Sequence, residues 1–406
     1  MDVEQTGRLR ALSLRGEPAG TAWTGRVARK TVPPEVSAVK ARSVWLAVSL
    51  ALAFTVSACG DDSSPGDEQK KRLTKVSEAV LDNGVPGVVV VTAEDGKQTA
   101  TAWGQGDTAK KVPLSVDDRF RIGSVSKSYV AVIVLQLVDE KKLSLDDKIE
   151  KWLPGLVPNG ADITVRQLLN HSSGIPNYED NPKYLAPYLA GDLAHVTTPQ
   201  QLVRLGTALK PLFPPGTRAA YSNTNYTVAG LLVEKVTGTS LAVQLDRRIF
   251  EPLKLRTSYL PTKPGIEGPH AHGYYTIEKP PPTDITEFSP SIAFAGGGII
   301  STAGDVSSFY RGLFGGKLLP PELLKQMMTT VTGVGGVQYG LGLVRRTVPC
   351  GTAWGLDGNF PGYLVQSYAK ADAERQATIA LNLDPNSMSK KALAATTALF
   401  DDAFCG

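Results

Sequence analysis

The feature that most constrains the fold of this 406-residue chain is the segment SKSYVAVIVLQLVDE at residues 126–140. Its apolar residues lie almost all the way round a helix, and a helix of that kind is buried by the rest of the protein. An extended segment at residues 119–123 precedes it. The chain is therefore predicted to bury a helix whose first turn is reached directly from an extended segment.

The start of this helix carries the sequence Ser-x-x-Lys, from Ser124 to Lys127. Residues three apart on a helix share a face, with Cβ atoms about 5–6 Å apart, and free N–H groups at a helix N-terminus favour a developing oxyanion. A serine hydroxyl becomes a nucleophile when an unprotonated lysine in a dry pocket takes its proton. The motif recurs from residues 37, 367 and 387, and alone it also suits a helix cap with a solvated lysine. Only Ser124 opens a buried helix.

A second group of polar residues follows a turn at residues 214–217. Tyr221-Ser222-Asn223 comes just before a helix predicted over residues 226–237. A loop at the start of a helix can direct a phenol and an amide toward the same site. We therefore expect Tyr221 to relay a proton, and Asn223 to bind a substrate amide and hold Lys127.

Five segments then carry a resemblance to a known family: FRIGSVSKS, ITVRQLLNHSSGIP, FPPGTRAAYSNTNYTVAGLLVEKVTG, AGGGIISTAGDVSSF and YGLGL, in this order. Over roughly residues 73–406 the chain resembles the serine penicillin-recognising hydrolases, which include class C β-lactamases, secreted D-alanyl-D-alanine carboxypeptidases and related esterases. The resemblance implies that Ser124 is the acylated nucleophile, Lys127 its proton partner, and Tyr221 and Asn223 the second motif. It also implies that the backbone N–H groups of Ser124 and Asn359 form an oxyanion hole.

The third motif of that family is altered in this chain. Where the family carries Lys-Thr-Gly or His-Thr-Gly, the sequence reads Leu356-Asp357-Gly358. The glycine keeps the close backbone approach, but leucine replaces the cation that attracts a substrate carboxylate. Losing such a contact costs about 1.5–3 kcal/mol, or about one to two powers of ten in binding, and Asp357 adds repulsion. Neutral esters or amides are expected to be better substrates, unless Arg345 or Arg346 supplies the missing charge.

The N-terminal residues 1–58 are predicted to be a signal leader of the lipoprotein type. Residues 44–58 form an uncharged run that would rise roughly 22 Å as a helix, short of the ~30 Å membrane core, with basic residues before it and small residues at its end. The sequence VSAC at residues 56–59 resembles a lipobox that acylates Cys59; a plain signal peptide with an incidental cysteine is the alternative. Residues 59–72 are interpreted as a flexible tether. We therefore expect an extracytoplasmic lipoprotein of the cell membrane or, alternatively, a secreted protein.

Charge and cysteine content narrow the function further. The formal charge of +4 arises in the leader, which has eight basic and four acidic residues, whereas the remainder has 35 of each. A neutral body lacks the electrostatic footprint of a nucleic-acid binder. The other two cysteines, Cys350 and Cys405, are expected to form a disulfide in an oxidising compartment, with two free thiols as the alternative.

The histidines give no indication of a metal site. His270 and His272 do not have helical metal-ligand spacing and are expected to have no carboxylate or cysteine partner, so they are interpreted as a loop or cleft-wall pair. His171 follows a predicted helix and is assigned a capping or packing role. No metal or organic cofactor is expected.

The order of predicted elements indicates the fold class. A helix and a strand hairpin are followed by a mostly helical block at about residues 145–290, then by strands and a final helix. This order suggests one sheet assembled from both chain ends, with the helical block as a second lobe. We predict an α+β fold of the β-lactamase and DD-peptidase type over residues 73–406, with an antiparallel sheet flanked by helices.

These observations predict an exported serine hydrolase that works through an acyl-enzyme. The leading interpretation is a D-alanyl-D-alanine carboxypeptidase or β-lactamase-related peptidase acting on cell-wall peptides. A serine esterase or amidase acting on neutral substrates is the first alternative, favoured by Leu356. A non-catalytic penicillin- or wall-peptide-binding protein is the second, and the intact Ser124 and Lys127 argue against it. The expected partners are peptidoglycan-type peptides or small ester, amide or β-lactam substrates, and the membrane through a lipid anchor only.

Overall fold

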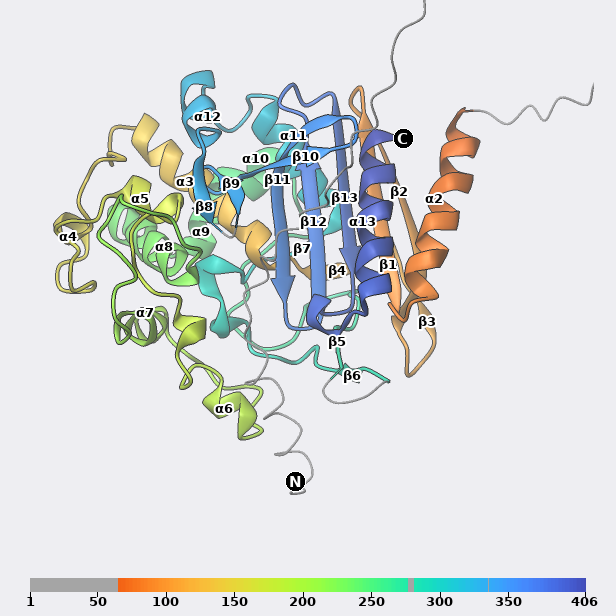
Figure 1. Ribbon diagram of the computed structural model, residues 1–406, viewed down its shortest axis with the longest axis horizontal. Helices are drawn as coiled ribbons and strands as arrows, with labels where there is room; N and C mark the ends of the chain where they lie inside the picture. Colours follow the sequence, from red (N-terminus) through yellow and green to blue (C-terminus); the bar gives the residue numbers. More distant parts are fainter. Residues whose placement is uncertain (1–64, 277–280, 335) are drawn as a thin grey trace, which may run out of the picture.

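The computed structural model describes residues 65–276, 281–334 and 336–406 of the chain. Its largest element is a nine-stranded antiparallel sheet in the order β3-β2-β1-β13-β12-β11-β10-β9-β8 (Figure 1). The strands are β1 (Gly87–Glu94), β2 (Lys97–Asp107), β3 (Val112–Pro113), β8 (Val331–Val334), β9 (Val337–Tyr339), β10 (Val344–Val348), β11 (Gly351–Phe360), β12 (Tyr363–Ala369) and β13 (Arg375–Leu381).

Strands from the two ends of the described chain lie side by side in this sheet. β1 pairs antiparallel with the last strand, β13, along most of its length. Because side chains alternate across a strand, Val89 and Val91 enter one hydrophobic core, whereas Val88 and Val90 enter the other. The sheet therefore separates two apolar layers, and each layer needs helices to cover it.

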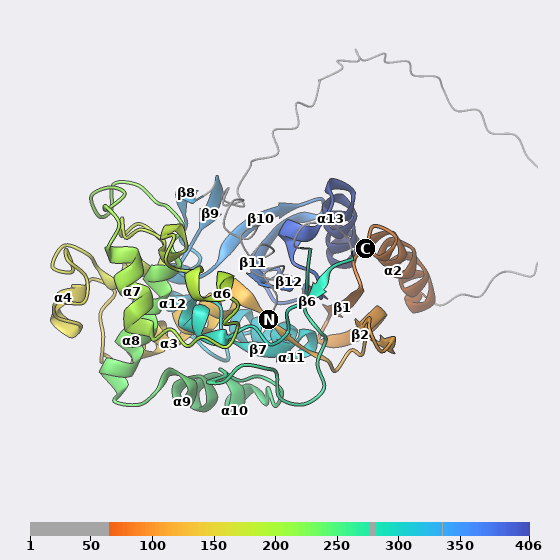
Figure 2. The same cartoon turned by 90° about the horizontal axis from the view of Figure 1, so that it is seen from below.

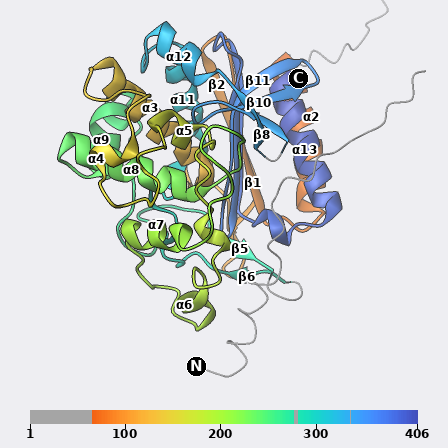
Figure 3. The ribbon, with the colours of Figure 1, turned by 60° about the vertical axis from the view of Figure 1, so that its left-hand side comes forward.

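Helices cover both faces of the sheet. The first and last helices, α2 (Pro65–Leu81) and α13 (Lys390–Cys405), pack against each other and against one face, as Figure 3 shows. On the opposite face, α11 (Ala303–Phe314) packs against β1, β12 and β13. The remaining strands of the described residues form two small two-stranded sheets. One pairs β4 (Arg119–Arg121) with β7 (Ile300–Thr302), and the other pairs β5 (Tyr274–Tyr275) with β6 (Thr283–Asp284).

The buried helix predicted over residues 126–140 is confirmed as α3 (Ser126–Asp139), in which eleven of fourteen residues are buried. α3 contacts α8, α9 and β11 and so lies between the helical side of the molecule and the sheet. Figure 2 shows α7, α8 and α9 gathered at the end of the molecule away from α2 and α13. The remaining α-helices are α4 (Ile149–Trp152), α5 (Val165–Leu169), α6 (Ala186–Leu189), α7 (Pro199–Thr207), α8 (Asn223–Thr237), α9 (Leu241–Leu245), α10 (Glu251–Leu253) and α12 (Pro321–Met327).

The predicted α+β fold class, with a large antiparallel sheet flanked by helices, is confirmed. The predicted tether at residues 59–72 differs from the structure in its second half, because α2 already begins at Pro65. The sequence PGDEQKKRL explains this difference, since proline suits the first turn, acidic residues follow it, and the later residues favour helix. The predictions for the leader and for Cys59 concern residues that lie outside the described part of the chain.

One expectation about the histidines is wrong. His272 was expected to have no carboxylate partner, yet its Nδ1 lies 2.6 Å from Asp284 Oδ2 and its Nε2 lies 3.7 Å from Asp107 Oδ2. The fold brings these aspartates from other strands, so the spacing in the sequence could not reveal them. Even so, the described residues contain no group of three or more His, Cys, Asp or Glu side chains arranged to hold a metal ion.

Within the same described residues, no single helix has the length and hydrophobicity to cross a membrane. Two consecutive segments, Asn223–Thr237 and Leu241–Leu253, meet that criterion only when taken together, and they are bent by 81° relative to each other.

Cys350 and Cys405 lie within bonding distance, with their Sγ atoms 2.04 Å apart and their Cα atoms 5.5 Å apart. Cys350 directly precedes β11 and Cys405 ends α13. A bridge between them would tie the last helix to a strand in the middle of the sheet, and the two residues are separated by 55 positions.

We predict that replacing both cysteines with serine lowers the free energy of unfolding. Closing a loop of this length stabilises a fold by about 4 kcal/mol in the chain-entropy model, so a loss of about 2–4 kcal/mol is expected. Urea unfolding of the wild type and of the double variant measures the loss. Catalytic activity in the absence of urea should be unchanged, because neither sulfur contacts the candidate site; equal unfolding midpoints would contradict the prediction.

Candidate active site

Ser124 lies in a tight turn between an extended segment and the buried helix. The turn, η2 (Gly123–Val125), leads directly into α3. Gly123 has φ +52°, and a Cβ there would lie 2.4 Å from the carbonyl oxygen of Asn359. A Cβ at Gly358 would lie 1.9 Å from the carbonyl oxygen of Ile122. The two glycines therefore let the backbone of β11 touch the turn that carries Ser124.

Lys127 is fully buried on the first turn of α3, and its Nζ reaches three oxygens. It lies 2.9 Å from Ser124 Oγ, 2.6 Å from Asn223 Oδ1 and 2.5 Å from the carbonyl oxygen of Gly296. A neutral amine has two N–H groups, and these donate to Asn223 Oδ1 and to the carbonyl oxygen of Gly296. Its lone pair then faces the hydroxyl of Ser124.

Tyr221 and Asn223 flank the start of α8. Asn223 is the first residue of that helix, and Tyr221 lies two residues before it, next to the N-cap residue Ser222, whose backbone is extended. The Tyr221 hydroxyl lies 2.6 Å from Ser124 Oγ. The structure thus brings together the four side chains that the sequence singled out, Ser124, Lys127, Tyr221 and Asn223, in one hydrogen-bonded cluster. The helix begins three residues earlier than predicted, because Ser222 is its N-cap residue.

Burial shifts the pKa values of Lys127 and Tyr221 in opposite directions. Loss of solvation lowers the pKa of Lys127 from its ordinary 10.5 to about 7, with the charge of Glu179 opposing that change. Burial raises the pKa of Tyr221, against the hydrogen bond with Ser124. Near neutral pH, therefore, Lys127 is suited to accept the Ser124 proton, whereas Tyr221 remains a phenol that can donate one.

His171 packs behind the cluster, in line with the capping or packing role expected from its sequence position, although the sequence did not show that Tyr221 is its neighbour. It is fully buried with φ +62°, and its ring centre lies 4.5 Å from that of Tyr221. Its Nδ1 accepts hydrogen bonds from the backbone N–H of Ser222 and from the Asn225 side chain, each at 3.2 Å. Burial, followed by the charge of Lys127, lowers the pKa of His171, so the imidazole is neutral. The segment LLNHSSGIP, which contains His171, belongs to the family resemblance, but nothing else in the sequence indicated that His171 contacts Tyr221.

The altered third motif lies on β11 with its residues on alternate faces. Leu356 is 3 % exposed and belongs to the same hydrophobic core as α3, whereas Asp357 is exposed on the opposite face. Desolvation raises the pKa of Asp357, while Arg346 opposes the rise. Asp357 therefore does not face the same side of the sheet as Leu356, and the repulsion expected from it does not follow from this arrangement.

The two arginines expected to replace the missing cation are placed differently. The guanidinium of Arg346 lies over the Phe400 ring of α13 at 4.2 Å and pairs with Asp401 at 3.4 Å, so it belongs to the far face of the sheet. Arg345 pairs with Trp354 across the strands, on the same face as Leu356, and donates to Gln338 Oε1 at 2.9 Å. The structure thus does not bring Arg346 to the Ser124 cluster, and Arg345 is occupied by a neighbouring strand.

Comparison with known proteins gives consistent matches over this region. A family model described as Beta-lactamase matches residues 70–401. The chain is 26 % identical over 279 residues to penicillin-binding protein 4* of Bacillus subtilis strain 168, a match that covers 64 % of this chain and 60 % of that protein. It is 29 % identical over 314 residues to a D-aminopeptidase of Brucella anthropi, which covers 73 % of this chain and 56 % of that protein. The chain therefore spans less than two thirds of either curated relative.

Among solved structures, a D-stereospecific amidohydrolase from a Streptomyces species has a TM-score of 0.73 and 36 % sequence identity. The match covers 80 % of this chain and 97 % of that structure.

We predict that the catalytic rate with an uncharged p-nitrophenyl ester rises with pH through about 7 and then stays high. Lys127 accepts the Ser124 proton only as the neutral amine, which forms above its pKa. A profile of kcat/KM between pH 5 and 9, corrected with Ser124→Ala for background hydrolysis, measures this. A rate that is flat or falls across that range would exclude Lys127 as the base.

We also predict that Gly358→Ala lowers kcat by at least about 100-fold, which is the typical cost of losing one oxyanion donor. The added methyl group would collide with the Ile122 carbonyl and move β11 away from the Ser124 turn. Gly304→Ala is the matched control, because a Cβ there meets its nearest neighbour at 3.4 Å. Equal activity of the two variants would argue against a role for the β11 backbone.

Proposed function

Because this chain belongs to the Beta-lactamase family of serine hydrolases, we propose that it cleaves amides or short peptides that have a free amino group beside the scissile carbonyl. The family membership confirms the resemblance inferred from the sequence. The proposed reaction passes through an acyl-enzyme on Ser124. Its substrate class is that of an aminopeptidase or amidase, which corresponds to the amidase alternative considered from the sequence rather than to the carboxypeptidase.

The distribution of charge around Ser124 is the observation that carries this proposal. Leu356 occupies the position of the family cation, so that strand offers no charge to a substrate carboxylate. Glu179 is an acidic group whose charge raises the pKa of both Lys127 and Tyr221. A site with this balance favours a substrate with a positive group over one with a negative group.

Glu179 is exposed to solvent and connected to the cluster through asparagines. The Asn177 side chain donates to Glu179 Oε2 at 3.1 Å and accepts from the backbone N–H of Asn223 at 3.1 Å. Surrounding protein raises the pKa of Glu179, while Asn177, Lys127 and Asn223 oppose the rise. An ammonium group on the substrate would stabilise the charged carboxylate in the same way. Glu179 is therefore the proposed partner of the substrate amino group.

The proposed mechanism uses the hydrogen bonds of Ser124 with Lys127 and Tyr221. Neutral Lys127 takes the proton of Ser124 Oγ as that oxygen attacks the carbonyl carbon, and the oxyanion accepts the backbone N–H groups of Ser124 and Asn359. Collapse of the tetrahedral intermediate breaks the C–N bond. Tyr221 gives its proton to the leaving nitrogen, and the Lys127 ammonium, 4.9 Å from the Tyr221 ring centre, supplies the replacement. Water then hydrolyses the ester by the reverse sequence of proton transfers.

The proposed stereochemical preference is for D-configured acyl groups. Its support is the similarity to proteins described as a D-aminopeptidase and a D-stereospecific amidohydrolase. No described contact of this chain selects the configuration by itself.

A D-alanyl-D-alanine carboxypeptidase is the second candidate. The similarity to a penicillin-binding protein favours it, and the Ser124 cluster would serve its acyl transfer equally well. It requires a group that binds the terminal carboxylate, and Leu356 does not supply one. A neutral esterase is the third candidate, and it needs neither Glu179 nor a cation to bind its substrate. A non-catalytic binding protein would not need Lys127 to transfer a proton.

We also propose that the protein is exported and held at the membrane by a lipid on Cys59. The support is the leader pattern in residues 1–58 together with the pairing of Cys350 with Cys405, which suits an oxidising compartment. Substrates would then be peptides and amides outside the cytoplasm.

We predict that D-alanine p-nitroanilide is hydrolysed with a kcat/KM at least about tenfold above that of its N-acetyl derivative, which has no amino charge. Glu179→Gln should remove this advantage, and Asp180→Asn, which removes the same charge one residue further along, should preserve it. Ser124→Ala provides the background rate.

A peptide ending in D-Ala-D-Ala completes the comparison. Preferential release of its terminal D-alanine would replace the proposal with the carboxypeptidase. Equal turnover of the free and N-acetylated anilides would indicate the neutral amidase or esterase, and absence of turnover or Ser124 acylation would indicate the binding protein.

A further inference from the structure

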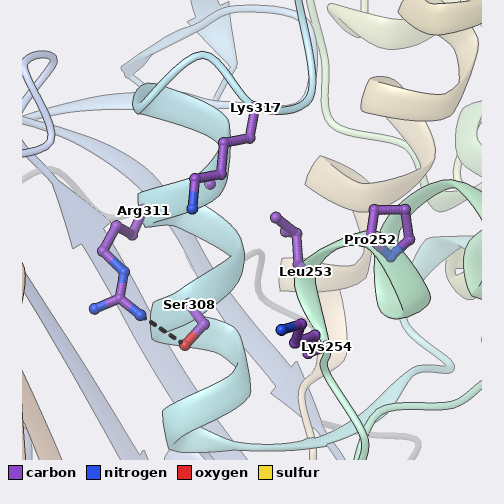
Figure 4. A pocket seen from close by; sticks show the side chains of 7 residues that line it. Pro252, Leu253, Lys254, Ser308, Arg311 and Lys317 are labelled. Atoms are coloured by element: carbon purple, nitrogen blue, oxygen red, sulfur yellow. Dashed lines mark hydrogen bonds between the residues drawn. The ribbon is translucent and has the colours of Figure 1, made fainter.

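A second pocket lies between α10 and α11, and it contributes no residue to the Ser124 cluster. It has a volume of about 230 Å³. Figure 4 shows Ser308 and Arg311 on α11 and Lys317 after its end, with Pro252, Leu253 and Lys254 on the facing segment. Nothing in the reaction proposed above uses these residues.

The pocket is positively charged and contains no acidic lining residue. Lys254, Arg311 and Lys317 all line it. No ion pair joins any of these three to a carboxylate within the described chain, although eleven ion pairs occur there. Arg311 is half-buried and donates to Ser308 Oγ at 3.3 Å and to the Gly96 carbonyl oxygen at 3.4 Å. Because Ser308 Oγ accepts from Arg311, its own proton can be donated to a ligand. Three cations and a hydroxyl thus surround a hollow without a counter-charge.

The backbone holds these groups in place. A Cβ at Gly312 would lie 2.7 Å from Leu253 Cδ2, so the glycine lets Leu253 pack directly on α11. Lys254 follows at once with φ +58°, a left-handed conformation that normally favours glycine. The backbone N–H of Lys317 donates to the Gly312 carbonyl at 2.9 Å, which turns the chain back toward the pocket after α11.

We infer that this pocket binds the phosphate group of a small phosphomonoester. A phosphomonoester carries close to two negative charges at neutral pH and several acceptor oxygens, which the cations and the Ser308 hydroxyl can satisfy together. A monovalent carboxylate would leave more of the positive charge uncompensated. Pro252 and Leu253 provide an apolar edge for the alcohol part of the ester. The phosphate can belong to a free metabolite or to a lipid headgroup, and the site chemistry is shared by both.

The test is binding of glycerol 3-phosphate to the full chain, measured by isothermal titration calorimetry at fixed salt, with glycerol as the uncharged comparison. The double variant Lys254→Gln with Lys317→Gln should weaken binding at least about tenfold, because it removes two charge-assisted contacts. Lys390→Gln with Lys391→Gln is the matched control, since it removes the same charge from two exposed lysines at the start of α13. Ester hydrolysis by Ser124 verifies that both double variants are folded.

Sedimentation with vesicles that contain phosphatidic acid, whose headgroup is a phosphomonoester, or phosphatidylcholine alone separates the two sources of phosphate. Binding of glycerol 3-phosphate that depends on the pocket lysines supports the inference with a free ligand. Pocket-dependent binding to phosphatidic acid vesicles alone supports it with a lipid headgroup. No binding in either arm, or equal loss in the two double variants, would overturn it.

Discussion

The burial of one amine controls what the Ser124 site can do. Lys127 is fully enclosed, and removal of its solvation brings its pKa from 10.5 to about 7. In the neutral form its two N–H groups donate to Asn223 and to the Gly296 carbonyl, and its lone pair then faces the Ser124 hydroxyl. This arrangement requires α3 to be buried, α8 to begin at Asn223, and the Gly296 backbone to approach closely. The packing of α3, α8 and the Gly296 segment therefore excludes water from the Lys127 side chain.

Close backbone packing is the second constraint, and it joins the helical side to the sheet. Gly123 and Gly358 allow the serine turn and β11 to touch where any side chain would collide. β11 is itself held in a sheet that the two ends of the chain complete, since β1 pairs with β13. Ser124 and the strand beside it, β11, come from opposite halves of the chain, so the candidate site depends on contacts between residues far apart in the sequence.

The replacement of a cation by Leu356 connects substrate choice with proton transfer. A cation in that position would favour a substrate carboxylate and would also lower the proton affinity of Tyr221. With leucine there, Tyr221 keeps its proton and Lys127 is the group that can act as base, while Glu179 is left as the charge that a substrate amine can meet. One difference from the family motif thus affects both the role of the tyrosine and the charge of the substrate that we propose.

The sequence alone was enough to predict the buried helix, the fold class, and the Ser124, Lys127, Tyr221 and Asn223 set. The helix follows from local periodicity, and the fold and the four residues follow from the order of elements, from short motifs and from the family resemblance that those motifs carry. It could not place Arg346 on the far face of the sheet, set the pKa of Lys127, or put His171 behind Tyr221, His272 beside Asp284 and Glu179 near the cluster. Those facts depend on which segments meet in space and how much water they exclude. Contacts between residues far apart in the chain, and the desolvation they cause, exist only in the folded structure.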